Sequence, residues 1–311
     1  MCYTQSRFKA LISACVMSLI ATAGWSQSLT WLGTLSGGNQ SYASDVSADG
    51  ALVVGWAEDD AWLWRAFRWE NGVMQVLGTL GGGGSWANGV SADGAVVVGG
   101  SYNAAAYGRA FRWTASGGMQ DLGTLGGTWS AANAVSADGS VVVGWAWNAA
   151  GFYRAFRWTA AGGMQDLGTL GGDESAAYGV SADGSVVVGE SVDRAFRWTA
   201  SRGMEDLNTT YASLLTNGSV LWGAYAISPD GRYIAGYGRN AATRRWEAFL
   251  LDTGFPRRGD VDRNGCVDDA DLLQVLFAFG GRGYRNEDLN WDGTVDDADL
   301  LEVLFNFGSG C

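Results

Sequence analysis

A pattern of short motifs recurs along this chain about every 45 residues, and this repeat limits the possible folds more than any other feature of the sequence. Leu-Gly-Thr-Leu begins at Leu32, Leu77, Leu122 and Leu167. A turn of the form Val-Ser-Ala-Asp-Gly begins at Val46, Val90, Val135 and Val180, and a variant with proline begins at Ile227. Repeats of this length are typical of proteins in which similar supersecondary units stack in series.

Each unit carries the signals of four short strands. The third unit predicts strands at residues 131–136, 140–145, 154–159 and 164–170, and the first two are joined by a tight turn at Asp138-Gly139. Asp-Gly between β-branched residues is a strong hairpin signal. The second strand is a Val-Val-Val-Gly run, and the third reads Arg-Ala-Phe-Arg-Trp. The two-residue period of a strand places Phe and Trp of this motif on one face and Ala on the other.

These units predict an all-β fold, namely a β-propeller over residues 28–253 with about five four-stranded blades. Six blades are the alternative. The opening segment, residues 29–35, resembles the strand that the last unit lacks, so we expect it to pair with the last blade and close the ring. Residues 208–217 interrupt the period before the fifth unit, and we interpret them as an insertion with a helical turn.

The C-terminal part of the chain contains a second duplication. Two twelve-residue segments, residues 260–271 and 288–299, have glycine at position 6 and oxygen-bearing side chains at positions 1, 3, 5, 9 and 12. This is the spacing of a calcium loop, which also uses the backbone carbonyl at position 7. Each loop precedes the same apolar pattern, Leu-Leu-x-Val-Leu-Phe-x-Phe-Gly, which predicts a helix. We expect a small α-helical module over residues 259–311 that binds two Ca²⁺ ions.

The expected calcium ligands follow from the positions in each loop. In the first loop they are Asp260, Asp262, Asn264, the carbonyl of Cys266, Asp268 and Asp271. In the second loop they are Asp288, Asn290, Asp292, the carbonyl of Thr294, Asp296 and Asp299. Packing several like charges into one loop is unfavourable without the ion, so we expect the module to be poorly folded in the absence of calcium.

The first residues predict export. Arg7 and Lys9 precede an apolar run over residues 10–23, which is the pattern of a signal peptide over residues 1–23 and is too short for a membrane-spanning helix. The mature chain then keeps Cys266 and Cys311, and an even pair of cysteines in an exported protein predicts a disulfide. We expect a secreted or cell-surface protein with no membrane span.

Composition excludes several classes of enzyme. The chain has no histidine, and its one lysine is Lys9. A Ser/His/Asp triad, a histidine-containing zinc site and a lysine Schiff base are therefore excluded. The net charge is -12, and residues 254–311 contribute -7 of it through 12 acids and 5 arginines. This charge argues against nucleic acid as a partner. We expect a monomer that is not an enzyme.

The repeat resembles the HAF repeat, a probable extracellular repeat of secreted bacterial proteins. The motifs that carry the resemblance are the Arg-Ala-Phe-Arg-Trp units beginning at Arg65, Arg109, Arg154 and Arg194, together with their turns. Arginine stands where the family has histidine, and the closing unit, residues 206–251, looks like that family's terminal copy. The resemblance implies an extracellular location and no established chemistry.

The calcium module resembles a type I dockerin, because position 12 of each loop is aspartate and an apolar helix follows directly. Dockerins bind cohesins through positions 10 and 11, here Asp269-Ala270 and Asp297-Ala298, and through the following helix. Residues 272–279 and 300–307 lack the basic residues common on such helices, so another surface protein or the chain's own propeller stays open as the partner. The expected role of the module is attachment or assembly, with the propeller as an interaction or structural platform.

Two further functions stay open for the propeller. Exposed aromatic residues can stack on sugar rings, and the candidates for a polysaccharide site are Trp62, Trp64, Tyr102, Tyr107, Trp147 and Tyr153. A glycoside hydrolase needs two carboxylates over one pocket. The acids outside the repeat are Glu58, Asp59, Asp60, Asp173, Glu174, Glu190 and Asp193. The aspartates and arginines that recur in every unit are interpreted instead as turn caps and as ion pairs between blades.

Overall fold

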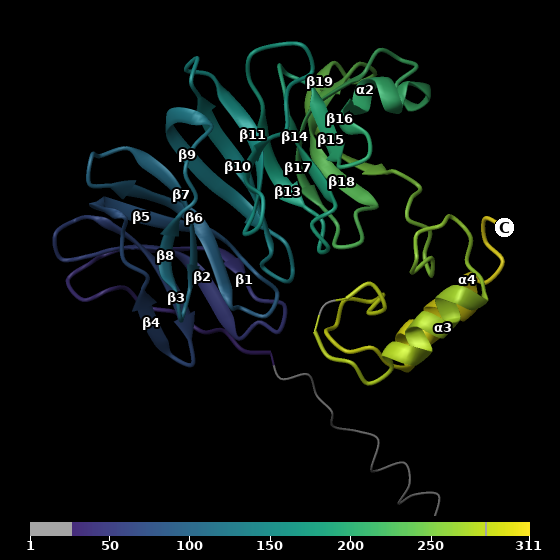
Figure 1. Cartoon of the computed structure of the whole chain (residues 1–311), viewed down its shortest axis with the longest axis horizontal. Coiled ribbons are helices and arrows are strands. Elements are labelled where there is room, and N and C mark those ends of the chain that lie inside the picture. The colour runs from purple at the N-terminus through teal and green to yellow at the C-terminus, as the bar shows by residue number, and fades with distance from the viewer. Residues whose placement is uncertain (1–26, 284) are drawn as a thin grey trace, which may run out of the picture. The chain divides into compact units, whose positions relative to one another are not determined.

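The computed structural model describes residues 27–283 and 285–311 of the 311-residue chain. The predicted signal peptide, residues 1–23, lies outside the described residues. In the described part, antiparallel strands form five sheets that follow one another in chain order, four of them with four strands and the last with three (Figure 1). The prediction of an all-β, propeller-like fold is thus confirmed.

The strands of each sheet are consecutive in sequence. The first sheet contains β1 (Ser41–Val46), β2 (Leu52–Glu58), β3 (Trp64–Glu70) and β4 (Val73–Val76). The second contains β5 (Gly81–Val90), β6 (Val96–Asn103), β7 (Gly108–Thr114) and β8 (Gly118–Asp121). The third contains β9 (Gly126–Val135), β10 (Val141–Asn148), β11 (Tyr153–Thr159) and β12 (Gly163–Asp166). The fourth contains β13 (Ala176–Val180), β14 (Val186–Glu190), β15 (Ala195–Thr199) and β16 (Gly203–Asp206). The fifth contains β17 (Val220–Ile227), β18 (Tyr233–Asn240) and β19 (Arg245–Asp252).

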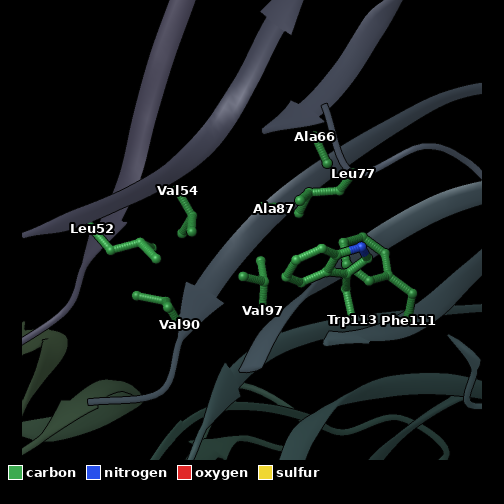
Figure 2. Close-up of a cluster of buried hydrophobic side chains, with 9 residues drawn as sticks. All are labelled: Leu52, Val54, Ala66, Leu77, Ala87, Val90, Val97, Phe111 and Trp113. Carbon is green, nitrogen blue, oxygen red and sulfur yellow. The ribbon is translucent and has the colours of Figure 1, made fainter. Parts of the chain in front are cut away.

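Consecutive sheets pack face to face through the residues that repeat. Between the first two sheets the buried cluster consists of Leu52, Val54, Ala66, Leu77, Ala87, Val90, Val97, Phe111 and Trp113 (Figure 2). Phe111 and Trp113 belong to this cluster, whereas Ala110 belongs to the cluster shared with the third sheet. The alternation predicted for the Arg-Ala-Phe-Arg-Trp motif is therefore present, and it places bulky side chains against small ones across each interface.

The glycine that ends each Val-Val-Val-Gly run is required by the close approach of the neighbouring strand. Gly144 of β10 lies opposite Ala132 of β9. A Cβ atom at Gly144 would overlap the carbonyl oxygen of Ala131, and Gly99 stands in the same relation to Trp86. These strands can approach this closely only because a side chain is missing.

The repeated aspartates cap their turns as predicted. In the second sheet, Ser91 Oγ and the backbone N–H of Ala95 donate to Asp93 Oδ1 over 2.6 and 2.9 Å. The repeated arginines depart from the prediction, because their ion pairs stay within one sheet. Across an interface the guanidinium of Arg112 donates to the carbonyl oxygen of Gly139 over 3.3 Å. The turn of the next sheet offers this arginine a carbonyl group, not a carboxylate.

The predicted closing strand at residues 29–35 is wrong. Residues 27–40 contain no strand, so the fifth sheet keeps three strands and not the four expected of every blade. The carbonyl of Gly33, in the middle of the predicted strand, instead accepts a hydrogen bond of 2.7 Å from Ser41 Oγ of the first sheet. No sixth sheet is present in the part of the chain that the structure describes.

The insertion before the fifth sheet has the predicted helical character. A short helix α2 (Leu207–Thr210) and a 3-10 turn η1 (Ala212–Leu214) follow directly after the fourth sheet. Asp206 caps α2, because its side chain accepts from the N–H of Asn208. Leu207 is fully buried in the cluster between the fourth and fifth sheets.

The C-terminal segment contains the two helices that the apolar patterns predict. Helices α3 (Asp269–Ala278) and α4 (Asp297–Asn306) follow the two loops (Figure 1) and pack against each other. A buried core joins them to the loops and consists of Val261, Val267, Val275, Val295 and Val303. Cys266 and Cys311 form a disulfide. No helix in residues 27–283 and 285–311 has the length and apolar character needed to cross a membrane.

Candidate functional site

The first twelve-residue loop folds around the side chain of its last residue. Asp271, which is fully buried, accepts the backbone N–H groups of Val261 and Asp262 at Oδ1 over 2.7 and 3.1 Å. Its Oδ2 accepts the N–H of Asp268 over 2.9 Å. Gly265 makes the sharp turn with φ of 93° and donates its N–H to Asp260 Oδ2 over 2.9 Å. The loop backbone thus converges on two carboxylates.

One carboxylate oxygen of this loop is buried and has no hydrogen-bond donor. Asp260 is only 4% exposed, and its Oδ1 has no partner. One carboxylate oxygen from each of Asp260, Asp262 and Asp271 lies within 4.8 Å of the other two. Burial raises the pKa of the Asp260 carboxyl, and the charges of Asp271 and Asp262 raise it further. A cation between these oxygens would remove both the repulsion and the unsatisfied acceptor.

The second loop repeats this arrangement. Asp299 accepts the N–H groups of Leu289 and Asn290 at Oδ1 over 2.6 and 3.1 Å. Gly293, with φ of 90°, donates to Asp288 Oδ2 over 2.8 Å. Burial raises the pKa of Asp288, and the charges of Asp299 and Asp292 add to this effect. Asn290 stands where the first loop has Asp262, and Asp292 stands where it has Asn264, so each loop has four aspartates and one asparagine among its side-chain ligands.

The remaining predicted ligands lie in the loops at the expected positions. Asn264 Oδ1 accepts the N–H of Cys266, and Asp292 Oδ1 accepts the N–H of Thr294. Asp268 and Asp296 cap α3 and α4, because one oxygen of each accepts the N–H of the alanine two residues later. The second oxygen of each cap carboxylate does not accept this N–H. The donor set of both loops consists of hard oxygen atoms, which suits Ca²⁺.

The helices next to the loops carry apolar residues that the loops do not cover. On α3 these are Leu273, Leu276 and Phe277, and on α4 they are Leu301, Leu304 and Phe305. Phe277 and Phe305 are 87% and 81% exposed. We call these six residues the helix patch. The sequence did not single them out, because both helices continue after their first turn in a largely apolar run. Only the structure separates Leu272 and Val275, which face the core, from Leu273 and Leu276.

The six aromatic candidates for a polysaccharide site do not form one site. Trp64 lies edge-on to Trp56, with ring centroids 4.3 Å apart. Tyr102 and Tyr107 of the second sheet and its loop both contact Trp129, which belongs to β9 of the third sheet. Their ring centroids lie 6.1 and 6.2 Å from that of Trp129. Trp62, Trp147 and Tyr153 belong to neither group. The candidates are spread over separate strands and loops of the first three sheets.

Four of the acids outside the repeat line one cavity of about 360 Å³ on the third and fourth sheets. The lining residues are Phe152, Tyr153, Asp173, Glu174, Ser175, Glu190, Val192 and Asp193. Glu58, Asp59 and Asp60 lie in the first sheet and its loop, outside this cavity. The sequence could not group the residues that line the cavity, because they come from three separate segments, residues 152–153, 173–175 and 190–193.

Tyrosine hydroxyl groups hold the carboxylates of this cavity. Tyr178 Oη donates to Glu190 Oε1 over 2.7 Å, and Tyr225 donates to Glu190 Oε2 over 3.5 Å. Burial, a hydrogen bond to Glu174 and the surrounding acids raise the pKa of Tyr153 to about 12. Burial and the bond to Glu190 likewise raise the pKa of Tyr178. These phenols therefore stay protonated at neutral pH and donate to the acids.

Comparison with known proteins gives fold similarity alone. No family model matches the chain, and no curated protein matches it. The chain is similar to the solved structure of TolB from Acinetobacter baumannii, with 14% identity, a TM-score of 0.48, and coverage of 69% of this chain and 52% of that one. A putative TolB from Agrobacterium tumefaciens gives 14% identity and a TM-score of 0.48, with coverage of 68% and 77%. The β-propeller domain of the trilobed protease from Pyrococcus furiosus gives 11% identity and a TM-score of 0.43, with coverage of 69% and 70%. This chain thus spans about half the length of the Acinetobacter protein.

Proposed function

We propose that this protein is a secreted or surface-displayed binding protein without enzymatic activity. Its propeller is an interaction platform built from repeats of the HAF type. Its C-terminal module is dockerin-like, binds two Ca²⁺ ions and attaches the protein to a partner. The observation that carries this proposal is the helix patch, six exposed apolar residues at matching positions of α3 and α4, directly after two oxygen-lined loops.

Calcium would be held by the twelve loop residues predicted from the spacing. The buried Oδ1 of Asp260, which lacks a donor, supports this assignment because such an atom is costly without a partner. The ion would supply charge neutralisation. The chain itself supplies the loop backbone, which Asp271 and Asp299 already organise through three N–H bonds each.

Attachment through the helix patch follows from its exposure. Exposed apolar residues that gather on one surface are typical of protein contact sites, whereas single exposed apolar residues are common anywhere. The same three positions are exposed on both helices, so the patch is a duplicated surface. Since Asp268 and Asp296 both cap the helices and belong to the loops, calcium binding and the geometry of the patch are coupled.

The test is binding of the mature full chain to immobilised purified type I cohesin, with calcium and with a chelator. The proposal predicts binding that needs calcium and is lost when Phe277→Glu and Phe305→Glu are combined. Gln274→Glu, which adds the same charge to α3 outside the patch, is the control and keeps binding. Calcium uptake without cohesin binding would leave the module as a calcium site with a different partner. No calcium uptake would reject the function of the module altogether.

A second candidate function concerns the acidic cavity, and the grouping of four acids there favours it. Glu174 and Glu190 line one cavity with Phe152 and Tyr153, which supply an aromatic wall. A carboxylate pair next to aromatic rings is the equipment of a carbohydrate site, and of a glycoside hydrolase if the pair spans the bond to be cleaved. In that function Tyr178 and Tyr225 would hold Glu190 in place by donating to its two carboxylate oxygens.

The second candidate is tested on a panel of polysaccharides with release of reducing ends and with tryptophan and tyrosine fluorescence as readouts. Hydrolysis lost in Glu174→Gln and Glu190→Gln would establish an enzyme. Binding without hydrolysis that is lost in Tyr153→Ala would establish a lectin-like site. Asp60→Asn, an acid outside the cavity, is the control for both. No response to any polysaccharide rejects this candidate.

A further inference from the structure

A buried apolar cluster joins each pair of consecutive sheets in this protein, and three of the four interfaces also share one hydrogen-bond pattern. In three of them, an alanine of the Arg-Ala-Phe motif donates its N–H to a serine of the next sheet. The pairs are Ala66 with Ser85, Ala110 with Ser130, and Ala155 with Ser175, at 3.0, 2.9 and 2.9 Å. The serine in turn donates to a glycine carbonyl of the connecting Leu-Gly-Thr-Leu segment, as Ser130 does to Gly123 over 2.6 Å.

The receiving half of such an interface is present at the start of the propeller, where no sheet precedes it. Ser41 occupies the position of Ser85, Ser130 and Ser175, and it already donates to Gly33 over 2.7 Å. Among the described residues, no backbone N–H of a preceding sheet donates to Ser41. Val46 is 52% exposed, whereas Val90 at the same position of the second sheet is 8% exposed. The outer face of the first sheet is thus formed but not covered.

The donating half is present at the end of the propeller. Ala248 has the position of Ala110, because Phe249 lies opposite Gly236 as Phe111 lies opposite Gly99. β19 is the last strand of its sheet, so its outer edge has no partner strand in the described part of the chain. Leu250 is 72% exposed. The neighbouring ring of Trp246 is also exposed and stacks on Tyr237, with centroids 5.3 Å apart.

Buried clusters join the first sheet to the second and so on to the fifth, but none in the described residues joins the fifth sheet to the first. We propose that a second copy of this chain completes this missing interface, with the last sheet of one copy packed against the first sheet of the next. The two open faces carry the two halves of an interface that already occurs three times within the chain. Because the two open faces match the two halves of this interface, the partner that fits them is a second copy of this chain. An assembly of copies differs from the monomer expected from the sequence.

A contact between two different faces is heterologous, so it joins copies head to tail. It would bury the outer face of the fifth sheet, which carries the exposed side chain of Leu250. One backbone hydrogen bond that recurs between the turns of consecutive sheets cannot form across the contact between two copies. A series of N–H to carbonyl bonds runs from Ala48 to Ala92, Ala137, Ala182 and Pro229, and it ends there because proline has no N–H to donate. The intermolecular interface therefore depends on Ala248, Ser41 and the apolar residues around them.

The test is the molar mass of the mature full chain by light scattering and analytical ultracentrifugation over a range of protein concentrations. We expect a mass of at least twice that of the monomer, rising with concentration. Val46→Glu on the receiving face and Leu250→Glu on the donating face should each return the protein to a monomer. Val73→Glu, at an exposed position of β4, is the control and should assemble like the unaltered chain.

Mixing the two variants gives the decisive result. A Leu250→Glu copy keeps an intact first sheet, and a Val46→Glu copy keeps an intact last sheet, so the mixture should form a one-to-one dimer and nothing larger. A monomeric unaltered chain at all concentrations would overturn the proposal, and it would mean that the two faces close on each other within one chain. Assembly that Phe277→Glu abolishes but Val46→Glu and Leu250→Glu leave intact would also overturn it.

Discussion

The hydroxyl group of Ser130 joins two sheets, because Oγ accepts the backbone N–H of Ala110 over 2.9 Å and donates to the carbonyl oxygen of Gly123 over 2.6 Å. Ser130 is 1% exposed, so both partners lose their hydrogen bond to water on folding. The same connection at Ser85 and Ser175 makes this serine a structural residue of the repeat.

Ser130→Ala should lower the free energy of unfolding by about 1–3 kcal/mol, since it leaves a buried N–H without an acceptor. The measurement is the midpoint of urea unfolding followed by tryptophan fluorescence. Ser140→Ala, in an exposed turn of the same sheet, should change the stability by less than about 0.5 kcal/mol. Equal effects of the two substitutions would show that the interface does not depend on this hydroxyl.

Gly144→Ala should be more disruptive than the loss of a hydrogen bond. The added Cβ would overlap the carbonyl oxygen of Ala131 and approach the Cα of Ala132 at 2.9 Å, and backbone atoms cannot move aside as a flexible side chain can. We expect a loss of about 3 kcal/mol, the upper part of the range for overpacking. Gly83→Ala is the matched control, because no atom lies within 4 Å of its added Cβ. A tolerated Gly144→Ala would refute the account of the Val-Val-Val-Gly motif.

Single substitutions should remove the calcium sites one at a time. Asp260→Ala eliminates one of the two buried carboxylates of the first loop, and Asp288→Ala eliminates its counterpart in the second. Each should reduce the number of bound ions from two to one, as counted by calorimetric titration. Asp269→Asn changes an exposed acid of α3 that belongs to neither donor set, and it should keep two ions. Binding of two ions by Asp260→Ala would contradict the assigned ligands.

The affinity for calcium should fall as the pH falls. Burial and neighbouring acids raise the pKa of Asp260 and of Asp288 in the loops without an ion, so these carboxyls hold a proton at higher pH than an exposed aspartate does. Calcium binds the deprotonated form and must displace that proton. Below the raised pKa, the affinity should drop by about tenfold per pH unit for each proton displaced. Titrations in steps from about pH 7.5 down to about pH 4, the ordinary range of an aspartate, test this sign, and an affinity that stays constant over the whole range would contradict it.

Local sequence signals predicted the parts of this protein that depend on neighbouring residues. The Asp-Gly turns and alternating strands follow from patterns of a few residues, and the loop ligands follow from fixed spacing between Asp260 and Asp271. The missing closing strand was not predictable in this way, because strand pairing between residues 29–35 and β19 is a long-range choice with no local signal. The acidic cavity could not be predicted for the same reason, since Tyr153, Glu174 and Glu190 come together only in the folded chain.

Other features could not be predicted because the residue types that form them are common and carry no specific signal. Serine recurs at positions 41, 85, 130 and 175, but a small polar residue in a repeat suggests nothing until its position between two sheets is known. In the helices, Leu272 and Leu273 are equal by composition, and only the packing of Val275 and Val303 decides which of them faces the core.

The central claim is that the C-terminal loops bind calcium, and calorimetric titration of Ca²⁺ into the chelator-treated mature full chain tests it most directly. The account predicts two bound ions, with a gain of helical circular dichroism as α3 and α4 become ordered. No heat of binding and an unchanged spectrum would contradict it, and the loops would then be acidic turns held by their own backbone hydrogen bonds.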